Sequence, residues 1–177
     1  MSQVCRSRHE GAAPGTMVVM RLALFEPDIA QNAGTMMRLA ACLGVAVDLI
    51  EPCGFIVGDA KFRRSAMDYL DHIDLVRHNS WSAFQAARLA RPDPGRLVLL
   101  TTRADRRYID ASFEPGDTIL VGRESAGVPD AVHRAADLRL IVPMRAGLRS
   151  INVALSAAMV LGEALRQTHL FAEGLAR

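Results

Sequence analysis

The order of secondary-structure elements is clearest in residues 18–52, which read VVMRLALFEPDIAQNAGTMMRLAACLGVAVDLIEP. The apolar runs VVMRLALF and VAVDLIE have the length and composition of buried strands. Between them, apolar side chains recur every three or four residues, which is the spacing of one helical face. These side chains are Met36, Leu39, Ala40 and Leu43. We therefore expect a helix over residues 32–43, with Asn32 as its N-cap and Gly44 after its last turn.

The same alternation continues along the rest of the chain. Further strands are expected at HIDLVRH, RLVLLTT, TILVG and LRLIVP. Further helices are expected as a short basic helix at 59–66, a helix at 81–89, a short helix after Pro129 and a long helix at 150–168. This pattern predicts an α/β fold with a mostly parallel sheet and helices on both faces. Ligands of such sheets bind beyond the carboxyl ends of the strands, so the loops there are the first candidates for a site.

Length and composition predict one domain. The chain has 177 residues, 50% of them hydrophobic, which is enough for a single core. Residues 1–16 lack apolar periodicity and are expected to form a disordered tail before a domain at 17–177. No apolar run approaches the ~18 residues of a membrane span, and the first residues do not resemble a signal peptide. We expect a cytoplasmic protein without membrane association.

Cysteine usage and charge restrict the function less strongly. Cys5, Cys42 and Cys53 are odd in number and lack the spacing of metal ligands, so neither a disulfide framework nor a metal site is expected. The net charge is only +2, but 20 of the 21 basic residues are arginine. Arginine binds phosphate groups in a bidentate manner. Nucleic-acid binding is therefore open but not established by charge.

Two segments carry polar residues at predicted strand ends. In NAGTMMR, residues 32–38, Arg38 lies off the apolar stripe and faces either solvent or a ligand. In LVGRESAGVP, residues 120–129, Gly122 and Gly127 allow a ligand to approach the backbone, and Glu124 could hold the loop by accepting bonds from its amides. A dinucleotide-binding turn would instead carry GxGxxG after the first strand, which argues against a nucleotide-dependent oxidoreductase.

The third segment is VPMRAGLRSINVALSAAM, residues 142–159. Ser150 is the expected N-cap of the last helix, and Asn152 is expected in its first turn. The free amides of a helix N-terminus suit a carboxylate or another electron-rich oxygen. The helix that follows is apolar on nearly every side, so we expect it to be buried against the sheet, a second chain, or both. Its apolar positions include Val153, Leu155, Ala157, Met159, Val160 and Leu161.

The motifs NxGxxxR, GxExxG and VPM…SxNVxxS occur in this order, and together they resemble the SpoU branch of the SPOUT RNA methyltransferases. The resemblance covers residues 20–167. The segments LFEPDIAQNAGTMMR, IEPCGF, KFRRSAMDY and EALRQ are most similar to the TrmL-type tRNA methyltransferases, which act on a cytidine or uridine at the wobble position. The resemblance implies a deep C-terminal trefoil knot, a homodimer, S-adenosylmethionine as cofactor, and methyl transfer to the 2'-hydroxyl of the wobble ribose in the tRNA anticodon loop. The alternatives are ribosomal RNA 2'-O-methylation and a catalytically weak RNA-binding member of the fold.

The resemblance also implies roles for individual residues. The residues expected to bind the cofactor are Leu100, Thr101, Gly122, Glu124, Gly127, Val142, Met144 and Ser150. Those expected at the reacting ribose are Asn32, Arg38, Glu124, Ser150 and Asn152. Those expected to contact RNA phosphates are Arg63, Arg64, Arg103, Arg106, Arg107, Arg145 and Arg149.

Arg38 is expected to clamp a phosphate and stabilise the developing alkoxide, because a guanidinium stays protonated in proteins. Asn32 and Asn152 are expected to orient the ribose, and Glu124 to hold its loop. The chain departs from the TrmL-type pattern at Arg123, where relatives often have proline, and at Gly162, where a tyrosine has been assigned a catalytic part. A tyrosine-dependent mechanism therefore does not transfer to this chain.

Overall fold

The computed structural model of the chain describes residues 20–58, 62, 69 and 72–171. Several expectations fall outside this part of the chain. They concern the tail at 1–16, Cys5, the first residues of the first strand, most of the basic helix at 59–66, and both Arg63 and Arg64.

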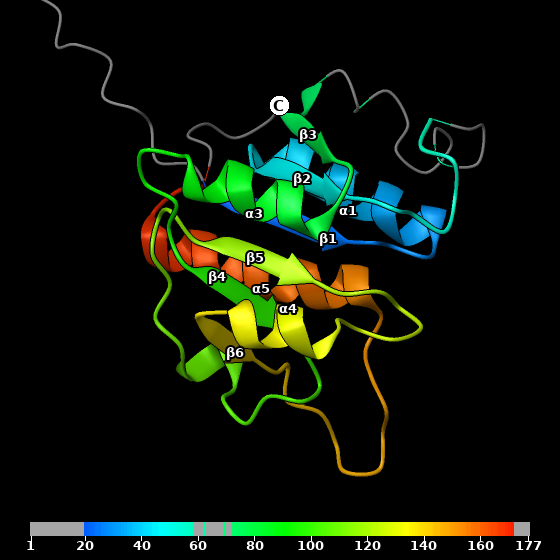
Figure 1. Cartoon of the computed structure of the whole chain (residues 1–177). Helices are drawn as coiled ribbons and strands as arrows, with labels where there is room; N and C mark the ends of the chain where they lie inside the picture. Colours follow the sequence, from blue (N-terminus) through cyan, green and yellow to red (C-terminus); the bar gives the residue numbers. More distant parts are fainter. Residues whose placement is uncertain (1–19, 59–61, 63–68, 70–71, 172–177) are drawn as a thin grey trace, which may run out of the picture.

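Six strands form one sheet in the order β3-β2-β1-β5-β4-β6, and every strand pair is parallel (Figure 1). The strands are β1 (Arg21–Phe25), β2 (Ala46–Ile50), β3 (Leu75–His78), β4 (Leu97–Leu100), β5 (Thr118–Val121) and β6 (Leu138–Leu140). The helices are α1 (Ala30–Leu43), α3 (Trp81–Leu89), the short 3-10 helix η2 (Tyr108–Asp110), α4 (Asp130–Ala135) and α5 (Val153–Thr168). The predicted α/β class is confirmed, with a sheet that is parallel throughout.

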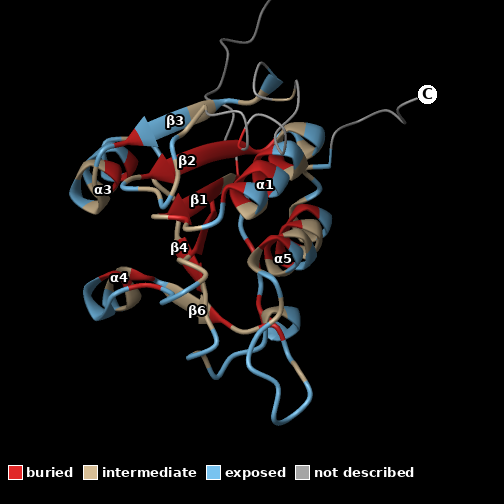
Figure 2. Ribbon diagram, turned by 90° about the vertical axis from the view of Figure 1, so that its right-hand side faces the viewer, coloured by how far each residue is buried: buried red, intermediate tan, exposed pale blue. Residues whose placement is uncertain are grey.

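Helices cover both faces of the sheet. Along β1, Leu22 and Leu24 belong to the core beneath α1 and α5, whereas Ala23 and Phe25 belong to a second core that contains residues of α3 and α4. Figure 2 shows the buried strands between these helices. The strand residues therefore read as continuous apolar runs, because both faces are buried.

The carboxyl ends of β1 and β5 form a switch point in the topology. The two strands are neighbours, but the chain leaves β1 for α1 on one face and leaves β5 for α4 on the other. Connections that diverge to opposite faces leave a crevice beyond the strand ends. The fold therefore places a binding crevice beside the loops at residues 26–29 and 122–127.

The start of α1 differs from the expectation. The helix begins at Ala30 after Ile29, without a side-chain cap, so Asn32 lies inside the first turn and is not the N-cap. Its end is as predicted, because Gly44 adopts a left-handed conformation with φ of 68° and its N–H bonds to the last turn. The buried stripe is also rotated, since Leu39 and Leu43 are only half-buried. The fully buried residues of α1 are Ala30, Ala33, Gly34, Met36, Met37 and Ala40.

The start of α5 is a second correction. The helix begins at Val153, and Asn152 is its N-cap, because its side-chain oxygen accepts from the N–H groups of Ala154 and Leu155 at 2.9 and 3.3 Å. Ser150 lies before the helix and does not cap it. In this single chain the apolar positions of α5 are not all buried, because Leu155 is 60% exposed and Met159 is 43% exposed. Burial of these two residues against a second chain stays a prediction.

A charged cluster lies in the core on the face of the sheet that α3 covers. Asp48 is fully buried, and Arg21 Nε donates to it at 2.7 Å, Arg91 Nη2 at 3.0 Å, while His78 Nε2 lies 2.8 Å from its Oδ1. Burial acts to raise the pKa of Asp48, but hydrogen bonds from Arg21 and His78 outweigh it and hold the pKa below its ordinary value. The cluster thus neutralises a charge that would otherwise destabilise the core.

Each helix in the described part of the chain is too short or too polar to cross a lipid bilayer.

Candidate active site

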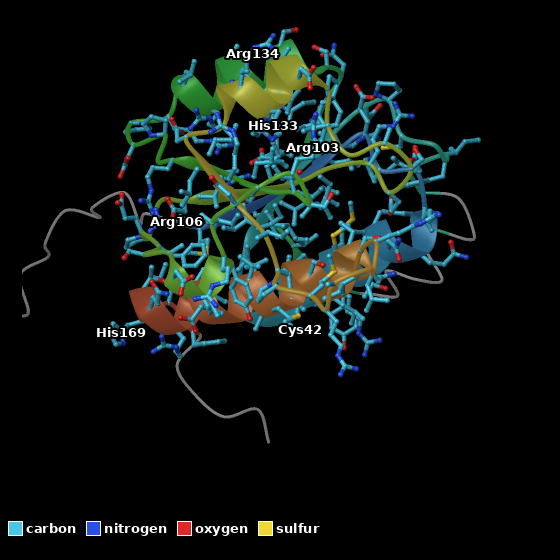
Figure 3. All side chains as sticks on the ribbon, turned by 90° about the horizontal axis from the view of Figure 1, so that it is seen from below. Cys42, Arg103, Arg106, His133, Arg134 and His169 are labelled. Carbon is cyan, nitrogen blue, oxygen red and sulfur yellow. The ribbon has the colours of Figure 1, made fainter. Side chains whose placement is uncertain are left out.

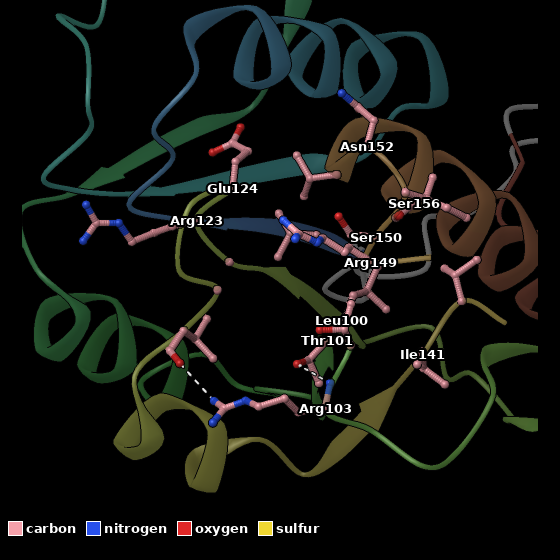
Figure 4. Close-up of a pocket in the computed structure, with 18 of the residues that line it drawn as sticks. Leu100, Thr101, Arg103, Arg123, Glu124, Ile141, Arg149, Ser150, Asn152 and Ser156 are labelled. Atoms are coloured by element: carbon pink, nitrogen blue, oxygen red, sulfur yellow. Dashed lines mark hydrogen bonds between the residues drawn. The ribbon is translucent and has the colours of Figure 1, made fainter. Parts of the chain in front are cut away.

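A cavity of about 580 Å³ lies beyond the carboxyl ends of β4, β5 and β6. It is formed by the loops that follow these strands, the segment before α5 and the first turn of α1 (Figure 4). All eight residues expected to bind the cofactor line it, namely Leu100, Thr101, Gly122, Glu124, Gly127, Val142, Met144 and Ser150. A volume in this range suits a ligand of cofactor size.

Glu124 is held in the cavity wall by two hydrogen bonds. Its Oε2 accepts from the backbone N–H of Asp28 and its Oε1 from Nδ2 of Asn32, both at 2.9 Å. Asn32 Oδ1 in turn accepts from Nδ2 of Asn152 at 3.1 Å. Figure 4 shows Glu124 and Asn152 beneath α1, with Leu100 and Thr101 on the opposite side of the cavity. Four of the five residues expected at the ribose therefore lie in one cavity: Asn32, Glu124, Ser150 and Asn152.

The donors and acceptors of this polar chain determine its two amide orientations. The Asn152 oxygen must be the atom that caps α5, because helix N–H groups require an acceptor. Its Nδ2 therefore faces Asn32, which must present its oxygen there. The Nδ2 of Asn32 is then left for the Glu124 carboxylate, which is an acceptor only. The hydrogen bonds that link Glu124, Asn32 and Asn152 can therefore all form with only one orientation of each side-chain amide.

The loop that carries Glu124 closes on itself. Arg123 and Gly127 exchange backbone hydrogen bonds of 2.9 and 2.8 Å, and Gly127 has φ of 65°. A Cβ at Gly122 would lie 2.6 Å from the Gly127 carbonyl carbon, closer than atoms can pack. Glycine at 122 is therefore required for this turn, which the GxExxG pattern alone did not explain.

Arg38 does not line the cavity. It lies on the exposed side of α1, as predicted, with its guanidinium carbon 5.1 Å from the centre of the Tyr69 ring. Six residues along a helix correspond to a rotation of about 240°, so Arg38 and Asn32 project from different sides of α1. Arg38 thus stands apart from the other four residues expected at the ribose.

The arginines expected to contact RNA phosphates lie in different places. Arg103 and Arg149 line the cavity, and Arg103 donates to Asp130 and to the Val128 carbonyl. Arg106 and Arg107 bond to Asp110 and do not line the cavity. In Figure 3, Arg103 lies beside His133 near the centre of the view, whereas Arg106 lies at its left. Arg145 is exposed in the segment before α5, and Arg63 and Arg64 lie outside the described residues.

The described residues contain no group of three or more His, Cys, Asp or Glu side chains arranged to hold a metal ion. Burial, with a contribution from Glu51, raises the pKa of the Cys53 thiol to about 11, so this cysteine is a weak nucleophile.

The model of the SpoU rRNA Methylase family matches residues 19–162. The chain belongs to this family. It is 56% identical over 155 residues to a tRNA (cytidine(34)-2'-O)-methyltransferase of Ancylobacter novellus, which covers 88% of this chain and 97% of the relative.

Two solved structures are similar in fold. One, described as giving structural insights into the 2-OH methylation of C/U34 on tRNA, has a TM-score of 0.78 at 37% identity and covers 84% of this chain and 95% of that one. The other is the SpoU methyltransferase AviRb from Streptomyces viridochromogenes in complex with AdoMet. It has a TM-score of 0.78 at 28% identity and covers 87% of this chain and 59% of that one.

Sequence reasoning missed some residues of this SpoU-family site. Ile141 and Ser156 line the cavity, and Asp28 supports Glu124 through its backbone N–H. Ile141 lies at the end of a predicted strand, and Ser156 lies one helical turn after Asn152. These positions in the sequence could therefore have indicated that both residues line the site. Asp28 had none, because nothing in FEPDI distinguishes it from an ordinary loop carboxylate. At Gly162, the space around a Cβ is open.

Proposed function

We propose that this protein transfers a methyl group from S-adenosylmethionine to the ribose 2'-hydroxyl of nucleotide 34 in tRNA. The observation that carries the proposal is the 56% identity, over nearly the whole length of the relative, to a tRNA (cytidine(34)-2'-O)-methyltransferase. The cavity retains the polar residues that such a reaction needs at the strand ends. Ribosomal RNA methylation, which the family description also allows, is an outcome of the test below.

The residues of the cavity fit S-adenosylmethionine. Apolar side chains of Leu100, Ile141, Val142 and Met144 offer a surface for a flat base, and the glycine-containing β5 loop exposes backbone groups beside them. The carboxylate of Glu124 already accepts two hydrogen bonds, so it suits a structural part better than a ligand contact. When bound, the cofactor supplies an electrophilic methyl group on a sulfonium.

The polar chain of the site would orient the ribose. Asn32 and Asn152 each keep one side-chain N–H beyond the hydrogen bonds described above, because an amide nitrogen carries two. These N–H groups, with the Ser150 hydroxyl, can hold ribose oxygens so that the 2'-oxygen lies in line with the methyl group. Alignment of this kind accounts for a large part of a barrier reduction. The proton of the 2'-hydroxyl then leaves to water, and no metal ion takes part.

We further propose that Arg38 serves the cavity of a partner subunit in a homodimer. Asn32 lines the cavity and Arg38 projects from a different side of α1, so we place Arg38 at the cavity of another chain. There it would clamp a phosphate and stabilise the developing alkoxide. Leu155 and Met159, four residues apart on α5, expose an apolar stripe that a second copy would cover.

Other expectations remain part of the proposal. Segment 141–152 crosses from the edge strand β6 to the side of α1, and it lines the same cavity as the loops after β4 and β5. Such a path supports a C-terminal trefoil knot. Arg103, Arg145 and Arg149 are suited to bind RNA phosphates near the cavity. We also propose that the protein is cytoplasmic, as a tRNA substrate requires, and that residues 17–177 form its single domain.

Transfer of labelled methyl to defined RNA tests the function. The purified protein should label a tRNA transcript from methyl-labelled S-adenosylmethionine and should not label a matched transcript with a 2'-deoxynucleotide at position 34. Equal labelling of the two transcripts, or labelling of ribosomal RNA alone, would contradict the proposal.

A further inference from the structure

Asp28 holds three consecutive residues of the β5 loop. Its backbone N–H donates to Glu124. Its carboxylate accepts from the residues on both sides: Oδ1 from Nε and Nη2 of Arg123 at 3.3 and 3.2 Å, and Oδ2 from the N–H of Ser125 at 3.1 Å and from the Ser125 hydroxyl. Asp28 thus holds the side chain of Glu124 through its backbone N–H, and holds the residues before and after Glu124 through its carboxylate.

The segment after β2 holds the backbone of Asp28 in place. The Gly54 N–H, in the segment after β2, donates to the Pro27 carbonyl at 2.9 Å. A Cβ at Gly54 would lie 2.8 Å from the Asp28 carbonyl oxygen, so the two backbones are as close as glycine allows. Arg123 also bonds to Glu26 at 3.2 Å, which ties the loop to the same connection a second time. The connection between β1 and α1 therefore forms a rigid support for the loop.

The cavity does not extend to Asp28. The residues that line it include Ile29 and Asn32 but not Asp28, so this carboxylate does not contact a ligand there. Its influence on the reaction passes through the loop residues that it holds, Arg123, Glu124 and Ser125, all of which line the cavity. Of these, Glu124 is the one whose other oxygen bonds to Asn32. Because Asn32 bonds to Asn152, a displacement of Glu124 would move the groups that face the ribose.

We propose that Asp28 is a positioning residue for methyl transfer, which fixes the carboxylate of Glu124 and thereby the side-chain amides of Asn32 and Asn152. The inference rests on the proposed function for its kinetic readout. The hydrogen bond from the Ser125 hydroxyl, with further contributions from Arg123, holds the pKa of Asp28 below its ordinary value. The group is therefore an anion at neutral pH, as an acceptor of all these donors must be.

The kinetic test compares Asp28→Asn with a matched control. Glu114→Gln also neutralises a carboxylate paired with an arginine, Arg96 at 3.0 Å, but Glu114 precedes β5 at the amino end of the strand and does not line the cavity. For Asp28→Asn, kcat should fall by ~10- to 10²-fold, the scale of a small misplacement of reacting groups. The KM for tRNA and the affinity for S-adenosylmethionine should change little, and Glu114→Gln should behave as wild type.

A double-mutant cycle distinguishes positioning from general destabilisation. If Asp28 acts through Glu124, the double variant Asp28→Asn, Glu124→Gln should be no slower than Glu124→Gln alone. Multiplied losses in the double variant, or a loss confined to KM, would overturn the inference.

A measurement without methyl transfer separates this inference from the proposed function. The side-chain amide NMR signal of Asn32 in the cofactor-free protein should shift in Asp28→Asn and stay in place in Glu114→Gln. An unmoved signal refutes positioning by Asp28, whatever RNA the wild-type protein methylates. Should Asp28→Asn not fold, Arg123→Met keeps the Ser125 contact and should shift the same signal by a smaller amount.

Discussion

The side-chain amide of Asn32 joins the two halves of the cavity. It donates to Glu124 and accepts from Asn152, so it connects the loop after β5 with the start of α5 through the first turn of α1. An aspartate at this position would place two carboxylates within hydrogen-bond distance, and an apolar residue would leave both partners unpaired. Only an amide meets both demands at this length.

Arg38 provides the most specific prediction for a single side chain. Arg38→Ala should leave folding and cofactor affinity nearly unchanged, because the residue is exposed, and should reduce turnover by at least ~10²-fold, the scale of one lost transition-state stabiliser. Arg38→Lys should restore turnover only in part, since a point charge lacks the bidentate geometry. Steady-state methylation of tRNA measures both variants.

The matched control is Arg134→Ala, which removes an exposed arginine from α4, on the other face of the sheet. It should turn over at the wild-type rate. Near-normal turnover of Arg38→Ala would remove Arg38 from the mechanism.

Variants at the start of α5 distinguish two roles of Asn152, which are capping of the helix and orientation of the substrate. Asn152→Ala should lower the free energy of unfolding by ~1 kcal/mol, because α5 loses its only side-chain cap. Ser150→Ala should leave stability unchanged, since Ser150 precedes the helix. Asn152→Ser should retain most of the stability but reduce turnover, because a hydroxyl at the cap no longer reaches Asn32.

Urea unfolding and turnover, measured on the same three variants, test this prediction. A loss of stability in Ser150→Ala equal to that in Asn152→Ala would show that Ser150 caps the helix after all.

The elements of this fold were largely predictable from apolar periodicity, but two helix starts were not. The span of α3, the end of α5 and the break at Gly44 follow from local pattern. Asn32 and Ser150 are both good caps locally, so the sequence favoured them. The structure instead uses Asn32 for bonds to residues 92 and 120 positions away, which no local pattern contains.

The site was predictable where the fold itself brings residues together. Parallel strands end at one edge, so Thr101, Gly122 and Val142, which follow three different strands, had to approach one another. The strand order and the support of Glu124 by Asp28 were not predictable, because periodicity carries no information about which strands are neighbours. The sequence indicated more apolar positions on α5 than one face needs, but it did not indicate that Leu155 would be the exposed one.

For the whole molecule, the proposed homodimer predicts complementation between two variants whose turnover is strongly reduced. Arg38→Ala and Glu124→Gln subunits, mixed and allowed to exchange, should regain about a quarter of wild-type activity, because half of the dimers then contain one complete site. Sedimentation should show two chains per particle, and Leu155→Glu should weaken this association. A monomeric active protein, or a mixture as inactive as its components, would contradict exchange of Arg38 between subunits.

The most direct measurement of the central claim is the position of the methyl group in natural tRNA. Total tRNA from a strain that lacks this protein would be incubated with the purified protein and S-adenosylmethionine, and its digestion products mapped by mass spectrometry. The account predicts a 2'-O-methyl group on the ribose of nucleotide 34 and its absence without the protein. Methyl groups found only at another tRNA position, or on a base, would contradict it.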